Sequence, residues 1–199
     1  MFFSKRVIPF AALMLSACEP GPVPQDTSPS TQASALTTPV VSNGCTFTAT
    51  AQQQAGFPPS YAYVLTRQAS SSCPWGAGSI NLGTSYTSTV ALAGNELGVA
   101  VAYTLKNTPS GSSPSSVYIK QIAPDTLATV RNATLTCGPA PYSTSLGNLS
   151  ILNTTTLQVD GSRGCTRFYG TPEQGSGPNY TADYFDFFTT TQPPAITAY

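Results

Sequence analysis

The chain has 199 residues, of which eight are basic, eight are acidic and none is histidine. Charged residues make up 8% of the chain, against roughly a quarter in typical domains. With so few basic side chains we expect no nucleic-acid binding, which needs a clustered positive surface. The lack of histidine excludes Ser-His-Asp and Cys-His catalysis and any histidine-ligated metal site.

The first residues, MFFSKRVIPFAALMLSAC, have the pattern of an export signal. Lys5 and Arg6 form a short positive region, and the apolar run VIPFAALML that follows is too short to span a bilayer. An ordinary cleaved secretory peptide would fit this much of the pattern. The run ends in LSAC at residues 15–18, however, and this motif resembles the lipobox of bacterial lipoproteins.

The resemblance implies that residues 1–17 are a signal peptide and that Cys18 is the first residue of the mature chain. In that family the cysteine thiol carries a diacylglycerol, and its amino group carries a further fatty acyl chain. Each buried CH₂ contributes about 0.8 kcal/mol, so three chains would hold the protein stably on a membrane. Glu19 replaces the Asp that resembles an inner-membrane retention signal. We therefore expect a lipid-anchored protein of the bacterial cell envelope, at the outer membrane.

The segment that follows is rich in Pro, Ser, Thr and Gln and shows no apolar periodicity. This composition predicts that residues 18–43 comprise the lipidated cysteine and a disordered tether. Residues 44–199 then form a single domain, long enough to bury a core. Removal of Lys5 and Arg6 with the signal peptide leaves six basic and eight acidic residues, a small net negative charge.

Five cysteines are an odd number for an exported protein. Lipidation of Cys18 would leave four, which allow three pairings that sequence alone cannot distinguish. Cys45 and Cys73 are 28 residues apart, and so are Cys137 and Cys165, which suggests sequential pairing. Disulfides are favoured over a metal site because the destination is oxidising and no C-x-x-C motif occurs.

Alternation of apolar and polar residues recurs along the domain and predicts short β-strands. Turn signals separate them, among them Ala123-Pro124-Asp125-Thr126 and Asp160-Gly161. No helical periodicity follows the signal peptide, so about nine strands predict an all-β antiparallel sandwich. The predicted strands lie within residues 45–51, 60–66, 85–92, 98–105, 116–122, 126–135, 148–159, 165–170 and 180–188.

Catalytic signatures are lacking in the domain. No G-x-S-x-G motif occurs, and Asp183 and Asp186 would face opposite sides of a strand. A hydrolase would need dispersed carboxylates, such as Asp160, Glu173 and Asp183, to meet in one cleft. We therefore expect no enzymatic activity, no cofactor and no metal.

Aromatic residues are the remaining candidates for ligand binding. Trp75, in CPWGAG, would either pack beside a disulfide or stack on a sugar from a loop. Tyr180 and Tyr184, in NYTADYFDFF, would either be buried in a C-terminal strand or form an exposed binding strip. The favoured function is structural or adhesive interaction in the envelope. The alternative is a module that binds carbohydrate or peptidoglycan, with an envelope glycan or another envelope protein as its partner.

Overall fold

The computed structural model describes residues 34–138 and 142–199; the predicted signal peptide and Cys18 lie outside this range. The described residues form sixteen strands and no helix, which confirms the predicted all-β sandwich. Three main sheets and one small two-stranded sheet account for all the strands.

The N-terminal sheet contains β1 (Ser34–Leu36), β2 (Val40–Ser42), β3 (Cys45–Gln53), β4 (Tyr61–Arg67) and β5 (Gly78–Ser85). The middle sheet is a meander of β6 (Val90–Asn95), β7 (Gly98–Lys106), β8 (Ser115–Ile122) and β9 (Thr129–Leu135). The C-terminal sheet has the order β11 (Thr144–Leu152), β12 (Thr156–Arg163), β15 (Asn179–Tyr184), β16 (Ala195–Ala198) and β14 (Glu173–Gly175). The small sheet pairs β10 (Cys137–Gly138) with β13 (Arg167–Phe168). Apart from β14 and β16, which are parallel, all pairs are antiparallel.

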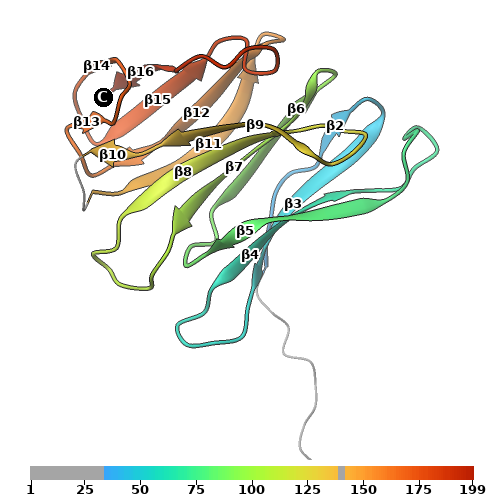
Figure 1. Cartoon of the computed structure of the whole chain (residues 1–199), viewed down its shortest axis with the longest axis horizontal. Helices are drawn as coiled ribbons and strands as arrows, with labels where there is room; N and C mark the ends of the chain where they lie inside the picture. The colour runs from blue at the N-terminus through green and yellow to red at the C-terminus, as the bar shows by residue number, and fades with distance from the viewer. Residues whose placement is uncertain (1–33, 139–141) are drawn as a thin grey trace, which may run out of the picture. The chain divides into compact units, whose positions relative to one another are not determined.

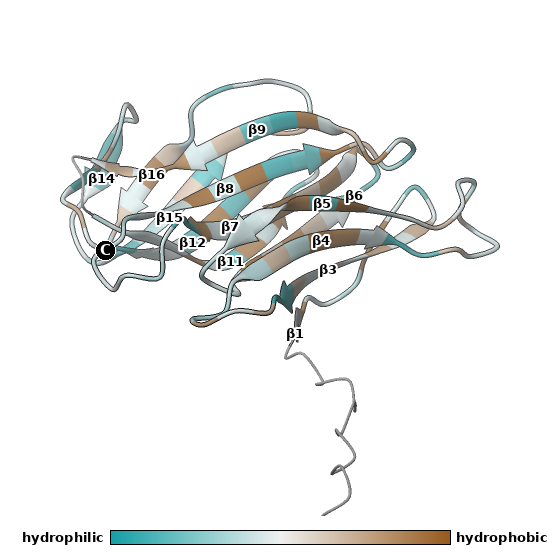
Figure 2. Ribbon diagram, turned by 60° about the horizontal axis from the view of Figure 1, so that its bottom comes forward, coloured by the Kyte–Doolittle hydropathy of each residue, from teal (hydrophilic) through white to brown (hydrophobic). Residues whose placement is uncertain are grey.

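The middle sheet lies between the two outer sheets, so the sandwich has three layers and two cores (Figure 1). Strand β7 is buried on both faces over most of its length. Its larger side chains, Val99, Val101 and Tyr103, enter the N-terminal core. The alternate positions, Ala100 and Ala102, enter the C-terminal core. Figure 2 shows the hydrophobic residues recurring along these strands.

The N-terminal core contains a buried network of tyrosine hydroxyls. Tyr63 Oη donates hydrogen bonds to the carbonyl oxygens of Thr87 (2.5 Å) and Thr104 (2.9 Å), which tie β4 to the middle sheet. Tyr103 Oη and Lys120 Nζ both donate to the carbonyl of Leu82, at 3.0 and 2.9 Å. Leu82 lies in β5, an edge strand of the N-terminal sheet, so these two donors tie that strand to β7 and β8 of the middle sheet.

The folded unit begins earlier than Gly44. Strands β1 and β2 lie within residues 18–43, and both pair with β3. The described part of the folded unit accordingly begins at Ser34. Each strand has only three residues, which is too short for an alternating pattern to be recognised.

Two turn predictions had different outcomes. The turn around Asp125 forms between β8 and β9. The predicted Asp160-Gly161 turn is wrong, because both residues lie inside β12 and the chain turns instead at Asn153, which has φ 50°. Gly161 is needed for packing: a Cβ there would approach Ser145 O to 2.0 Å and Tyr180 Oη to 2.7 Å.

Both sequential disulfides form. Cys45–Cys73 joins the start of β3 to the loop after β4, with a Cα–Cα distance of 4.4 Å. Cys137–Cys165 links β10 to the loop before β13, with a Cα–Cα distance of 5.5 Å. A disulfide closing a loop of this length contributes about 3.6 kcal/mol in the chain-entropy model. The chain is therefore a disulfide-stapled β domain.

Candidate functional site

Trp75 lies in the loop between β4 and β5 and is partly buried against the N-terminal core. The guanidinium carbon of Arg67 lies 5.9 Å from the centre of the Trp75 ring, a cation–π arrangement. The Trp75 carbonyl lies 2.8 Å from the sulfur of Cys73. The indole thus packs against Arg67 and the N-terminal core, and a ligand could reach only its remaining surface.

Arg67 is 7% exposed and donates only to backbone carbonyls. Its Nε binds Gly76 O at 2.7 Å, and its Nη1 binds Pro124 O and Asp125 O at 2.5 Å each. These contacts hold the β4–β5 loop, with Trp75, against the β8–β9 turn.

Arg163, at the end of β12, forms the one ion pair found among the described residues. Its Nη1 binds Glu173 Oε1, its Nε binds Gly177 O at 2.9 Å, and its guanidinium lies 5.7 Å from the Phe168 ring centre. Glu173 Oε2 also accepts the Phe168 amide at 3.0 Å. Both ionic side chains are buried, so the pair fixes β13 and β14 to β12.

Tyr180 and Tyr184 are buried in the C-terminal core, at 0% and 3% exposed. Tyr180 meets the Phe168 ring edge-on and donates to Ser145 O at 3.2 Å. Burial raises the pKa of both phenols, so both stay protonated. The ring of Tyr180 is not available for stacking on a ligand. Tyr184 borders two small cavities, described below.

The three dispersed carboxylates do not meet in one cleft. The register places Asp160 and Asp183 on the outer face of the C-terminal sheet, where they accept from Thr181 Oγ1 (2.7 Å) and Gln158 Nε2 (2.9 Å). Glu173 instead pairs in register with the buried Ile196, on the inner face. Asp160 lies in β12 and not at the turn expected from sequence, and Glu173 lies in β14.

Within residues 34–138 and 142–199, no group of three or more His, Cys, Asp or Glu residues is arranged to hold a metal ion. In the same ranges no helix is long and apolar enough to cross a membrane.

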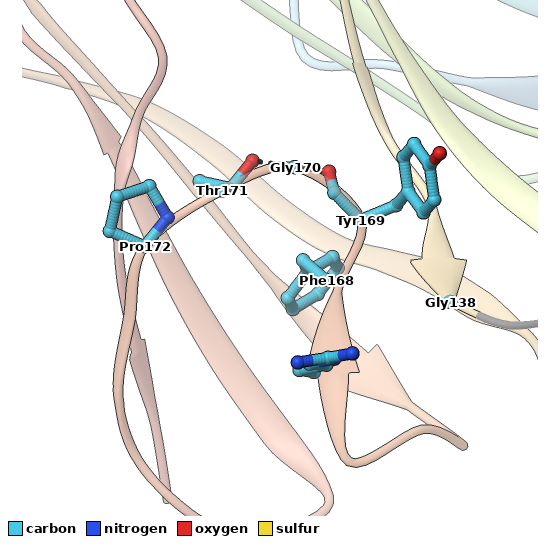
Figure 3. Close-up of a pocket in the computed structure, with 7 residues that line it drawn as sticks. Gly138, Phe168, Tyr169, Gly170, Thr171 and Pro172 are labelled. Atoms are coloured by element: carbon cyan, nitrogen blue, oxygen red, sulfur yellow. Dashed lines mark hydrogen bonds between the residues drawn. The ribbon is translucent and has the colours of Figure 1, made fainter.

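Tyr169 is an exposed aromatic residue that lines a cavity of about 560 Å³ at the end of β13. Figure 3 shows Tyr169 on the Gly138 side of the turn and Pro172 at its other end, with Phe168 between them. Tyr169 is 81% exposed, and Gly170 has φ 69°, a conformation that favours glycine. A Cβ on Gly138 would lie 3.1 Å from the Tyr169 ring, so glycine lets the ring approach β10.

Tyr169 was not among the residues that the sequence suggested. Its segment, RFYGTPE, carries a signal nevertheless, because an aromatic residue followed by Gly and Pro predicts a turn that presents the ring. The backbone of this turn is held by Tyr169 N donating to Thr136 O at 2.9 Å and by the β10–β13 pairing. The nearby Cys137–Cys165 disulfide restrains the same segment.

Comparison of the chain with protein-family models, with curated proteins and with solved structures finds no match. Function must therefore be inferred from the residues and their geometry.

Proposed function

We propose that this chain is a lipid-anchored, non-catalytic domain of the bacterial cell envelope, with a structural or adhesive role at the outer membrane. The observation that carries the proposal is the use of the cysteines. Four of the five form two disulfides, which are typical of exported proteins. The fifth, Cys18, ends the lipobox-like LSAC motif.

Replacement of Cys18 tests the anchor. We expect the native protein to sediment with envelope membranes and to incorporate labelled fatty acid, and Cys18→Ser to lose both properties. Ser16→Ala is the matched control, because it keeps a small residue at that place and should leave the anchor intact. Sedimentation of Cys18→Ser with the membranes at the native level would contradict the proposal.

A second candidate function, carbohydrate binding, is favoured by the exposed Tyr169 ring above its cavity. The flat face of an exposed aromatic ring provides the apolar surface on which a sugar ring stacks, and Thr171 and Arg167 line the same cavity with polar groups. Trp75, which the sequence suggested for this role, is partly covered by Arg67.

A glycan array and a peptidoglycan pull-down separate the two functions. If the domain binds glycans through this cavity, Tyr169→Ala should remove binding while Tyr169→Trp retains it. Trp75→Phe serves as the control at the other end of the domain. Absence of glycan binding by the native chain would leave the adhesive role alone.

A further inference from the structure

Two of the buried polar atoms that have no hydrogen-bond partner belong to residues that face one cavity. They are Nε of Arg131 and Oη of Tyr184. Unpaired buried groups are costly, because each has lost water without gaining a partner. Both residues line the same small cavity, of about 20 Å³, between β9 and the loop after β15.

Arg131 and Ala133 on β9 both line this cavity, and the small Ala133 leaves space beside the longer Arg131. The other two guanidinium nitrogens of Arg131 are engaged, Nη1 with Thr191 Oγ1 at 3.0 Å and Nη2 with Thr189 O at 2.7 Å. These bonds fix the guanidinium, and its buried Nε–H has no partner in the protein.

A second cavity, of about 270 Å³, adjoins the first. The first, of about 20 Å³, is called the inner cavity, and the second is called the outer cavity. The two share Ala133, Tyr184, Thr191 and Gln192 in their walls. The second is smaller than the roughly 300–1,000 Å³ of sites for drug-sized ligands. Its walls combine side-chain hydroxyl and amide groups with two flat prolines; these residues are Thr134, Thr171, Thr191, Gln192, Pro193 and Pro194.

The chemistry of these groups selects the ligand. Arg131 Nε–H is a donor, and Tyr184 stays a protonated phenol because burial raises its pKa. Among the described residues no carboxylate lies within 4.0 Å of the Arg131 guanidinium, so its charge has no ionic partner. Two donors and a free positive charge suit a carboxylate, with one oxygen in the inner cavity.

We propose that the two cavities between β9 and the β15–β16 loop bind an acidic sugar. Its carboxylate contacts Arg131 and Tyr184, and its ring occupies the outer cavity. The hydroxyl and amide groups of the outer wall match a hydroxylated ring, and the prolines match its apolar face. The outer cavity shares Thr171 with the Tyr169 cavity, so a longer acidic glycan would reach both. This inference deepens the carbohydrate-binding candidate and is independent of the lipid anchor.

Calorimetric titration of the full chain in detergent micelles tests the proposal. We expect N-acetylmuramic acid and galacturonic acid to bind, and their neutral counterparts N-acetylglucosamine and galactose to bind roughly tenfold more weakly, the effect of a hydrogen bond to a charged group. Acetate, a carboxylate without the ring, should bind more weakly than either acid. Equal binding of acid and neutral sugars would overturn the proposal.

Three variants locate the site. Tyr184→Phe should weaken acid-sugar binding about tenfold without lowering the melting temperature, because the hydroxyl has no partner in the protein. Ala133→Leu should abolish binding, because its side chain would fill the smaller cavity and narrow the larger one. Val130→Leu, at an exposed position of the same strand, is the control and should bind normally. Normal binding by Ala133→Leu would place the ligand elsewhere.

The Arg131 Nε–H resonance gives a direct readout by NMR. It should shift on addition of an acidic sugar and stay in place on addition of the neutral one. If no acidic sugar binds at millimolar concentration and the resonance is unmoved, a bridging water alone satisfies the two atoms, and the proposal fails. Tyr169→Ala should leave binding of the single acidic sugar intact, which distinguishes failure of this site from failure of the Tyr169 site.

Discussion

Arg67 and Arg163 hold corresponding positions in the two outer sheets, yet only Arg163 has a carboxylate partner. Each ends a strand, donates its Nε to a glycine carbonyl and lies over an aromatic ring close to a disulfide. Arg163 pairs with Glu173, whereas Arg67 binds three carbonyl oxygens. The comparison shows that oriented backbone dipoles can replace an ion pair in holding a buried guanidinium.

The two arrangements should differ in how they respond to the loss of a partner. Glu173→Gln leaves the buried Arg163 charge unpaired, which typically costs about 3–5 kcal/mol. Urea unfolding followed by circular dichroism measures the loss. Asp125→Asn is the matched control, because Arg67 binds the Asp125 carbonyl and not its carboxylate. A loss below 1 kcal/mol for Glu173→Gln, on the order of a surface pair, would contradict the importance of the ion pair.

The disulfides beside the two arginines offer a second comparison. Both close loops of 28 residues, so the chain-entropy model predicts the same loss of about 3.6 kcal/mol for either pair of Cys→Ser changes. Unfolding free energies of the two double variants give the measurement. Unequal losses would show that folded-state contacts around one bridge, and not the loop length, set its contribution.

Arg67→Lys should have a smaller effect than Glu173→Gln. Lysine keeps the charge but cannot reach three carbonyls in a planar array, and we expect a loss of about 1–3 kcal/mol. Trp75 is the only tryptophan and lies against Arg67, so its fluorescence should change in this variant and stay native in Glu173→Gln below the unfolding transition. A loss as large as that of Glu173→Gln would mean that the carboxylate makes no difference.

Alkaline pH tests the buried tyrosines of the N-terminal core. Burial, aided by Tyr118 and Tyr63, raises the pKa of Tyr103 from 10.0 to about 12. The folded protein then retains a proton that the unfolded chain releases. This contribution is complete below pH 10 and is lost as the pH rises toward 12. Tyr103→Phe should flatten this fall in unfolding free energy, whereas the exposed Tyr169→Phe should not.

The sequence predicted those long strands that have a buried and a less buried face, such as β8 with its alternating pattern. It missed β5, and the predicted strand 85–92 instead spans the loop between β5 and β6. Shorter strands such as β10 and β13 have two residues each, which is too few for a period. The turn at Asn153 was missed because most of the apolar residues before and after it occupy odd-numbered positions. The two strands β11 and β12 therefore resembled one continuous strand. The pairing of strands brings Glu173 to Arg163, and no short sequence pattern around either residue predicts which strands pair.

The candidate site was harder to predict than the fold. The positions of Tyr180 and Tyr184 in the alternation were compatible with burial or exposure, and only the packing of the C-terminal sheet decides that both are buried. Tyr169 follows a two-residue strand in a turn, where no alternation applies. The Arg131 cavity depends on Ala133 being small beside a distant loop, a relation that sequence does not express.

The Leu82 carbonyl has a consequence for strand addition, because it lies in an edge strand of the N-terminal sheet. An incoming strand would extend that sheet by pairing with free backbone groups of β5. At Leu82 the acceptor is already taken by Lys120 and Tyr103. A strand added along β5 would therefore have to break these two bonds or leave a gap in its ladder at this residue.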